Sequence, residues 1–254
     1  MVGYRLIEPF RFEKIRCELL PSIQVNLDLR DDTAWNIFYL GLRYETPTLS
    51  ILERWASRGG QRFFDIGANF GFFSLALTNR IKNLAAVAFE PNPATFVRLK
   101  TILAENSLDR IEALPLALSS HAAELKFQCE TGNSGASHVL SSSSSATDSI
   151  TVPAVAFDQL AADHGWRGVP SFAKIDAEGH DEAVLAGMET SLKEGWLQGI
   201  CIEMSRENLA AANSSPERLI ERLERAGYHS LNEPSIRRAH EKRGTDNWFF
   251  ERTV

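Results

Sequence analysis

The chain has little cysteine. Its 254 residues include three cysteines, Cys17, Cys129 and Cys201, which lie far apart and form no C-x-x-C pair. These residues cannot all pair with one another, which excludes a fully disulfide-bonded framework and suits a reducing compartment. We therefore expect them to be buried thiols.

Long hydrophobic runs and an excess of positive charge are also missing. Charged residues interrupt the first segment at Arg5, Glu8, Arg11, Glu13 and Lys14, and no later segment is apolar for long enough to cross a bilayer. The net charge is −6, so no global field attracts phosphate backbones. The sequence predicts a soluble, cytoplasmic protein without a membrane partner, and it disfavours nucleic acid as a partner.

The chain does contain an ordered alternation of strand-like and helix-like segments. Hydrophobic runs predict core strands at 62–66, 85–90, 111–117, 171–176 and 199–204, and helical periodicity falls between them at 70–80, 93–106 and 180–188. This alternation is typical of an α/β protein with a doubly wound parallel sheet covered by helices. A chain of this length is expected to form one domain with additions.

The two ends of the chain extend this core. Thr46 and Pro47 predict the N-cap and first residue of a helix that stops at Gly59 and Gly60. Residues 1–45 have no strong period, so we expect an N-terminal extension packed on a domain of residues 46–254. Near the C-terminus the sequence predicts a helix with Pro216 near its start, a short strand and a last strand.

One low-complexity segment lies at residues 131–149 and includes the serine run 141–145. Such a run cannot supply core contacts, which predicts a flexible surface loop, with a substrate lid as the alternative. The flanking stretches LKFQCE and SITVPAVAF have strand character. Together they predict a hairpin-like insertion before the fourth core strand.

A glycine turn follows the first core strand in the stretch DIGANFG, residues 65–71. Its spacing is not G-x-G-x-x-G, and no G-K-S or G-K-T follows, so it matches neither a dinucleotide fingerprint nor a phosphate loop. Glycine permits a tight turn and lets a ligand approach the backbone, while free N–H groups at the next helix favour an anionic group. The alternative is a plain strand-to-helix turn.

Glu90 ends the next strand, in the stretch AFEPNP. Doubly wound nucleotide-binding folds place an acid at about this offset on the ribose hydroxyls. A carboxylate accepts from both hydroxyls and repels a phosphate, so the two motifs together predict a nucleoside with free ribose hydroxyls. On its own, Glu90 would be read as a solvated strand end.

A third strand ends in carboxylates, in the stretch FAKIDAEGHD. Asp176 and Glu178 leave its carboxyl end, the edge at which such sheets bind ligands. Lys174 within the strand is interpreted as a partly covered structural charge.

Taken together, DIGANFG, FEPNP and KIDAEGHDEAVLAG resemble the FkbM family of methyltransferases, a branch of the class I S-adenosylmethionine-dependent fold. The resemblance covers residues 44–254 and is most specific in the KIDAEGH stretch. It implies a Rossmann-like seven-stranded sheet with an antiparallel last strand. It also implies S-adenosylmethionine as the methyl donor.

The resemblance further implies a set of cofactor-binding residues. The turn residues would hold the methionine end, Glu90 the ribose, and the two residues after Glu90 the adenine, together with Ala117 or Leu118. Glu45 resembles a family position near the methionine end, with a surface carboxylate as the alternative, and GNSGAS at 132–137 resembles a loop near the acceptor. The full set is Glu45, Asp65, Gly67, Ala68, Asn69, Gly71, Glu90, Pro91, Asn92, Ala117 and Asp176.

Asp176, Glu178 and His180 are the catalytic candidates because they leave the same strand end. Methyl transfer depends mainly on positioning, but an alcohol acceptor also loses a proton to a base. We interpret Asp176 as orienting donor or acceptor, His180 as the base or a structural histidine, and Glu178 as fixing the loop. Glu203 could approach Asp176 and hold Mg²⁺ with it, although the resemblance does not require a metal and none is expected.

The sequence therefore predicts a methyltransferase that acts on a hydroxyl of a small molecule, a sugar or a natural-product scaffold. An amine or guanidine acceptor is the nearest alternative, followed by a nucleic-acid methyltransferase, a non-catalytic nucleoside-binding module and a dehydrogenase. The stretch IRRAHEKR at 236–243 is the only cationic cluster in the sequence, and we interpret it as a solvated face. Neither the acceptor nor the oligomeric state can be read from the sequence.

Overall fold

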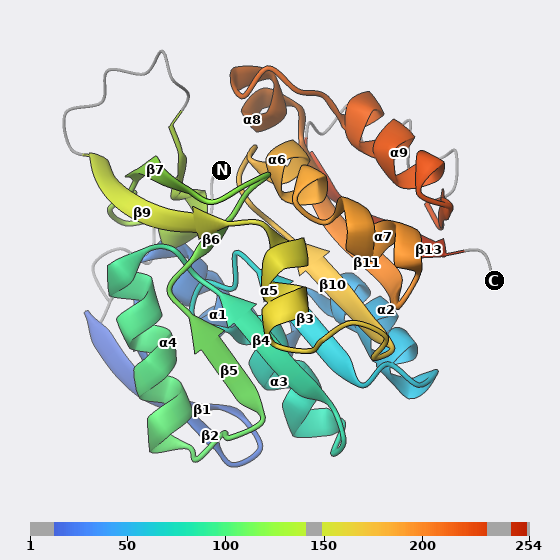
Figure 1. Ribbon diagram of the computed structural model, residues 1–254. Helices are drawn as coiled ribbons and strands as arrows, with labels where there is room; N and C mark the ends of the chain where they lie inside the picture. Colours follow the sequence, from blue (N-terminus) through green and yellow to red (C-terminus); the bar gives the residue numbers. More distant parts are fainter. Residues whose placement is uncertain (1–12, 141–148, 233–244, 253–254) are drawn as a thin grey trace.

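The computed structural model describes residues 13–140, 149–232 and 245–252. Within them, seven strands form a central sheet (Figure 1). In chain order these strands are β3 (Arg62–Ile66), β4 (Ala85–Phe89), β5 (Ile111–Leu114), β10 (Ser171–Ile175), β11 (Leu197–Ser205), β12 (Tyr228–Ser230) and β13 (Thr245–Arg252).

The strand order is β12-β13-β11-β10-β3-β4-β5. The pairs from β11 through β10, β3 and β4 to β5 are all parallel, whereas β13 runs antiparallel to both β11 and β12. The α/β architecture and the antiparallel last strand predicted from the sequence are both confirmed.

Helices cover both faces of this sheet. They are α2 (Thr46–Ser57), α3 (Phe72–Arg80), α4 (Pro93–Glu105), α5 (Phe157–Asp163), α6 (Asp181–Ala186), α7 (Glu189–Glu194), α8 (Arg206–Ala211) and α9 (Pro216–Arg225).

Successive side chains of each strand point to two separate hydrophobic cores. Phe63 and Phe172 belong to the core that also contains residues of α2, α3 and α4. Phe64 and Ala173 belong to the opposite core, with residues of α5, α6, α7 and α9. Because a parallel sheet is buried on both faces, its strands read as continuous hydrophobic runs, which is why the sequence located them.

A second, four-stranded sheet lies over the carboxyl ends of the parallel strands (Figure 1). It contains β6 (Ala117–Leu118), β7 (Ala123–Gln128), β8 (His138–Val139) and β9 (Ser149–Val155), in the order β6-β9-β7-β8. β7 and β9 pair antiparallel, which confirms the hairpin-like insertion. The part of the predicted Ser-rich loop at 141–148 and the cationic cluster at 236–243 lie outside the described residues.

The prediction of one strand over 111–117 was wrong. β5 stops at Leu114, and Ala117 and Leu118 pair with β9 in the second sheet instead. Pro115 lies at the break, and proline has no N–H to donate to a strand ladder.

The N-terminal segment packs on the same core. It consists of a hairpin, β1 (Lys14–Leu20) and β2 (Ile23–Asp28), followed by α1 (Asp32–Leu40) and a short 3₁₀ turn (Gly41–Arg43). Val25 and Leu27 are fully buried in the core shared with α2 to α4. The Asn106 side chain, at the end of α4, accepts from the Gln24 N–H and donates to its carbonyl, both at 2.8 Å.

The predicted N-cap of α2 was wrong by one residue. The helix begins at Thr46, and Glu45 occupies the cap position. Glu45 accepts a hydrogen bond from Thr48 Oγ1 at 2.9 Å rather than from a backbone N–H. Pro47 lies in the first turn, where its missing N–H costs nothing.

Candidate active site

A cavity of about 590 Å³ opens at the carboxyl ends of β3, β4 and β10. Its volume falls within the range typical of small-molecule sites. Its wall combines the loops after these strands with residues of α1, of segment 133–137 and of β13. Eight of the eleven predicted cofactor-binding residues line it: Glu45, Gly67, Ala68, Asn69, Glu90, Pro91, Ala117 and Asp176.

The other three, Asp65, Gly71 and Asn92, support this wall from behind. Asp65 is buried, and its Oδ2 accepts from the backbone N–H and the hydroxyl of Ser74, at 3.1 and 2.7 Å, which fixes the start of α3. Gly71 is the N-cap of that helix in a left-handed conformation. Asn92 caps α4 by accepting from the N–H groups of Ala94 and Thr95.

Gly67 has a structural reason to be glycine besides ligand approach. A Cβ at this position would lie 1.9 Å from the carbonyl oxygen of Asp176, and its φ is +75°. The Asp176 N–H in turn donates to the carbonyl of Ile66 at 3.0 Å. The absence of a side chain therefore lets two neighbouring strand ends approach backbone to backbone.

Glu90 is held in the cavity wall by backbone N–H groups of the loop after β3 and of the loop after β4. Its Oε2 accepts from the Asn69 N–H and its Oε1 from the Asn92 N–H, each at 2.8 Å. The residue is 6% exposed, and burial raises the pKa of its carboxyl to about 7. The carboxylate thus has a fixed orientation at the cavity surface.

Three carboxylates converge after β10 and β11. Ligand oxygens of Asp176, Glu178 and Glu203 all lie within 4.8 Å of one another. The negative charge of Asp176, helped by burial, raises the pKa of Glu203 to about 10. Both effects favour the protonated form of the Glu203 carboxyl.

Lys174 lies among these acids and also lines the cavity. It is 3% exposed; its Nζ is 2.6 Å from Asp176 Oδ2 and 4.9 Å from the centroid of the Phe73 ring. Burial lowers the pKa of Lys174, but its acidic neighbours, chiefly Asp176, outweigh that effect and raise it, so the ammonium persists. The sequence did contain a signal for this residue, a lysine in an otherwise hydrophobic strand, but we interpreted it as only partly covered.

Glu178 and His180 complete the predicted catalytic set, and both line the cavity. Glu178 Oε2 accepts from Asn208 Nδ2 at 2.6 Å, while burial and the charge of Asp176 raise the pKa of Glu178 to about 8. His180 Nε2 lies 3.0 Å from the Ser119 hydroxyl. Burial lowers the pKa of His180, which leaves its imidazole neutral at pH 7.

The wall that faces the strand ends was only partly predicted. Segment 133–137 lies there as expected, and Asn69 Nδ2 donates to Ser134 Oγ at 3.0 Å. Thr33 and Asn36 of α1 also line the cavity, but their region of the sequence has no strong period and gave no signal. Asn247 of β13 was missed as well, although a polar residue in a hydrophobic strand was a usable signal.

Glu45 connects α2 to the last strand at the cavity edge. The Asn247 side-chain amide donates to Thr48 Oγ1 at 3.2 Å and to Glu45 Oε2 at 3.5 Å. Burial raises the pKa of Glu45. It is therefore a partly buried wall residue and not a free surface carboxylate.

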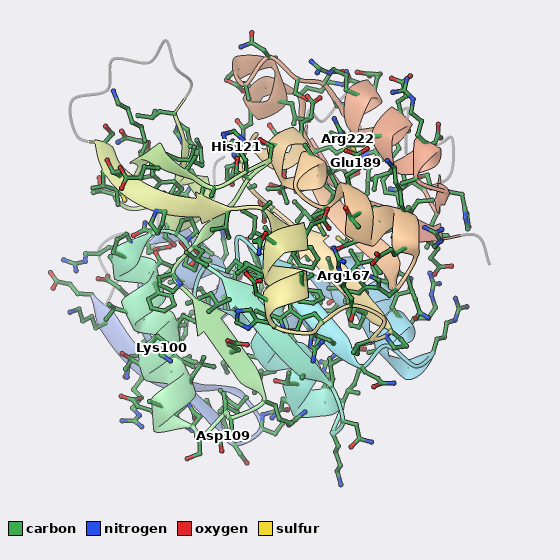
Figure 2. The ribbon with its side chains drawn as sticks, in the orientation of Figure 1. Lys100, Asp109, His121, Arg167, Glu189 and Arg222 are labelled. Atoms are coloured by element: carbon green, nitrogen blue, oxygen red, sulfur yellow. The ribbon has the colours of Figure 1, made fainter. Side chains whose placement is uncertain are left out.

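A separate concavity of about 250 Å³ lies between α7 and α9 and is lined mostly by charged side chains. Figure 2 shows Glu189 and Arg222 at this face. Arg218 pairs with Glu182, Lys193 with Glu189 and Arg225 with Glu221. The basic side chain of each pair is more than half exposed, so these pairs contribute little to stability. No helix within the described ranges has the length and apolar character needed to span a bilayer.

A family model described as the methyltransferase FkbM domain matches residues 65–230, which contain the glycine turn, Glu90 and the acidic cluster. The chain belongs to the FkbM methyltransferase family. The sequence resemblance is therefore confirmed at the level of the family.

Three known proteins illustrate what the chain is similar to. The hexuronic acid methyltransferase AglP of Haloferax volcanii is 29% identical over 130 residues, which span 51% of this chain and 51% of that protein. Among solved structures, an O-methyltransferase family protein from Burkholderia thailandensis aligns with a TM-score of 0.46 and 9% identity, over 87% of this chain and 59% of the other. TYW2 of M. jannaschii, in complex with AdoMet, aligns with a TM-score of 0.41 and 13% identity, over 95% of this chain and 87% of the other.

Proposed function

We propose that this protein transfers a methyl group from S-adenosylmethionine to a hydroxyl of a small molecule, a sugar or a natural-product scaffold. One observation carries the proposal. Glu90 presents a buried carboxylate, held by two backbone N–H groups, in the wall of a cavity of about 590 Å³. It lies next to the glycine turn, and both belong to the segment that matches the methyltransferase FkbM domain.

The residues present fit this donor. S-adenosylmethionine supplies an electrophilic methyl group on a positively charged sulfur. Glu90 would accept from its ribose hydroxyls, Pro91 and Ala117 would border the adenine, and Ala68 and Asn69 would hold the amino-acid end, with Glu45 nearby. Glu45 and Asp176 would also favour the sulfonium charge in a cavity partly shielded from water.

The acidic strand ends would serve the acceptor. Asp176 would orient the hydroxyl, and neutral His180 would take its proton as the oxygen–carbon bond forms and the carbon–sulfur bond breaks. Replacing His180 with asparagine is expected to lower kcat by about 10²-fold while leaving donor affinity unchanged. An unchanged kcat would remove His180 from this role.

The acidic residues of the cavity raise two further questions, whether the reaction uses a metal ion and which other acceptor the cavity suits. Carboxylate oxygens are the ligands that Mg²⁺ prefers, but Lys174 already supplies a cation to Asp176, so we propose a reaction without a metal. Among the described residues that line the cavity, acidic side chains outnumber lysine, which favours an amine as the second candidate acceptor.

Isothermal titration with S-adenosylhomocysteine and with NAD tests the donor. We expect clear binding of the first and none of the second. Incubation of labelled donor with pooled sugars, polyketides, amines and RNA then tests the acceptor. Binding of NAD alone, or transfer to RNA alone, would refute the proposal.

A further inference from the structure

A second cavity of about 420 Å³ adjoins the first. Four residues line both: Asn133, Ala136, Val139 and Glu178. The two spaces therefore border one another along these four residues. On its far side, the second cavity is bounded by Asn208, Ala211 and Ala212, in and just after α8.

Specific contacts fix the residues at the border of the two cavities. Glu178 has a left-handed backbone, with a φ of +48°, and its side chain is held by Asn208 at 2.6 Å. A Cβ on the following Gly179 would lie 2.6 Å from the Asn208 carbonyl oxygen, so this loop and α8 touch through their backbones. On the other side, the His138 ring nitrogen Nδ1 lies 3.0 Å from the Ala136 carbonyl oxygen.

The lining shows what this space can bind. Glu130, Asn133, His138 and Asn208 offer hydrogen-bonding groups, while Val139, Leu140, Ala211 and Ala212 give apolar surface. Within the described ranges the lining contains two acidic side chains, Glu130 and Glu178, and neither lysine nor arginine. Such a surface suits a group rich in hydroxyls and offers no cation to an anionic one.

We propose that the second cavity binds the part of the acceptor that lies beyond the reacting hydroxyl, and that this part is an uncharged polyhydroxy group such as a second sugar residue. The inference rests on the function proposed above. It assigns Glu178 and Asn208 to the boundary between the reacting unit and the distal unit.

The test compares Ala212→Trp, which adds a large side chain to the lining of the second cavity, with Ala210→Trp. Ala210 is an exposed residue of α8, two positions earlier, and lies outside that lining. Methyl transfer from labelled donor is measured with neutral monosaccharides, neutral disaccharides and disaccharides that contain a hexuronate. S-adenosylhomocysteine affinity is measured in parallel for each protein.

We expect Ala212→Trp to lower kcat/KM for the neutral disaccharides by about tenfold or more, with monosaccharide transfer and S-adenosylhomocysteine affinity unchanged. Ala210→Trp should match the wild type, and hexuronate disaccharides should be the poorer acceptors. Equal effects of the two variants, or a preference for hexuronate, would overturn the inference. If the wild type binds S-adenosylhomocysteine but methylates no saccharide, this inference fails alone; if it does not bind, the proposed function fails too.

Discussion

Lys174 and Asp176 form an ion pair of 2.6 Å at the carboxyl end of β10, with the lysine buried in the sheet and the aspartate at the cavity. The two residues are two positions apart along the chain, and residues i and i+2 of an extended strand point to the same face, which explains the contact. Asp65, which is buried, is the register partner of Lys174 on β3 and adds a second acid near the ammonium. The acidic strand ends are therefore tolerated because one buried cation lies among them.

Removing that cation should destabilise the protein. We expect Lys174→Met to lower the free energy of unfolding by about 3 kcal/mol, because it leaves buried carboxylates without their partner. Urea denaturation measures the loss. The double variant with Asp176→Asn should lose less than the single one; a larger loss would show that the pair does not act as a unit.

Donor affinity should depend on pH through Glu90. Burial raises the pKa of this carboxyl to about 7, so it is ionised at pH 8 and mostly protonated at pH 6. Since only the carboxylate accepts from both ribose hydroxyls, S-adenosylhomocysteine should bind about tenfold more weakly at pH 6 than at pH 8. Calorimetry on the wild type and on Glu90→Gln separates this effect from titration of the ligand. The variant should bind weakly at both pH values, and an equal pH dependence in the two proteins would exclude Glu90 as the cause.

The close approach at Gly67 can be tested against a glycine of similar conformation. Gly168 has a φ of +77°, and a Cβ there would meet nothing within 4 Å. Gly168→Ala should cost about 1 kcal/mol of stability from the backbone alone. Gly67→Ala should cost about 3 kcal/mol or more, because the added carbon overlaps the Asp176 carbonyl. Similar thermal unfolding of the two variants would argue against the overlap.

Removing divalent metal ions tests whether the three acidic residues Asp176, Glu178 and Glu203 form a metal site. We expect EDTA to leave the methyl-transfer rate within about twofold of its untreated value, because Lys174 and not a divalent ion neutralises Asp176. Added Mg²⁺ should not increase the rate. Loss of activity in EDTA that Mg²⁺ restores would instead assign Asp176, Glu178 and Glu203 as metal ligands.

The sequence located most of the sheet because its strands are buried on both faces and end in glycines or acids. Element boundaries were less accurate: Pro115 divided one predicted strand, and Glu45 displaced Thr46 from the cap. The part of the cavity wall at the strand ends was predictable because it is built from residues close in sequence to those ends. The wall formed by Thr33 and Asn36 was not, because it arises from packing between distant segments with no local period.

The cavity is lined by two kinds of element. The glycine turn and Glu90 follow strands of the sheet, whereas α1 and segment 133–137 pack against the ends of those strands, for example through Asn69 and Ser134. Under the proposed function, changes in α1 and segment 133–137 would alter which acceptor binds while the residues that bind the donor stay the same. Diversification within such a scaffold would then be concentrated in its periphery.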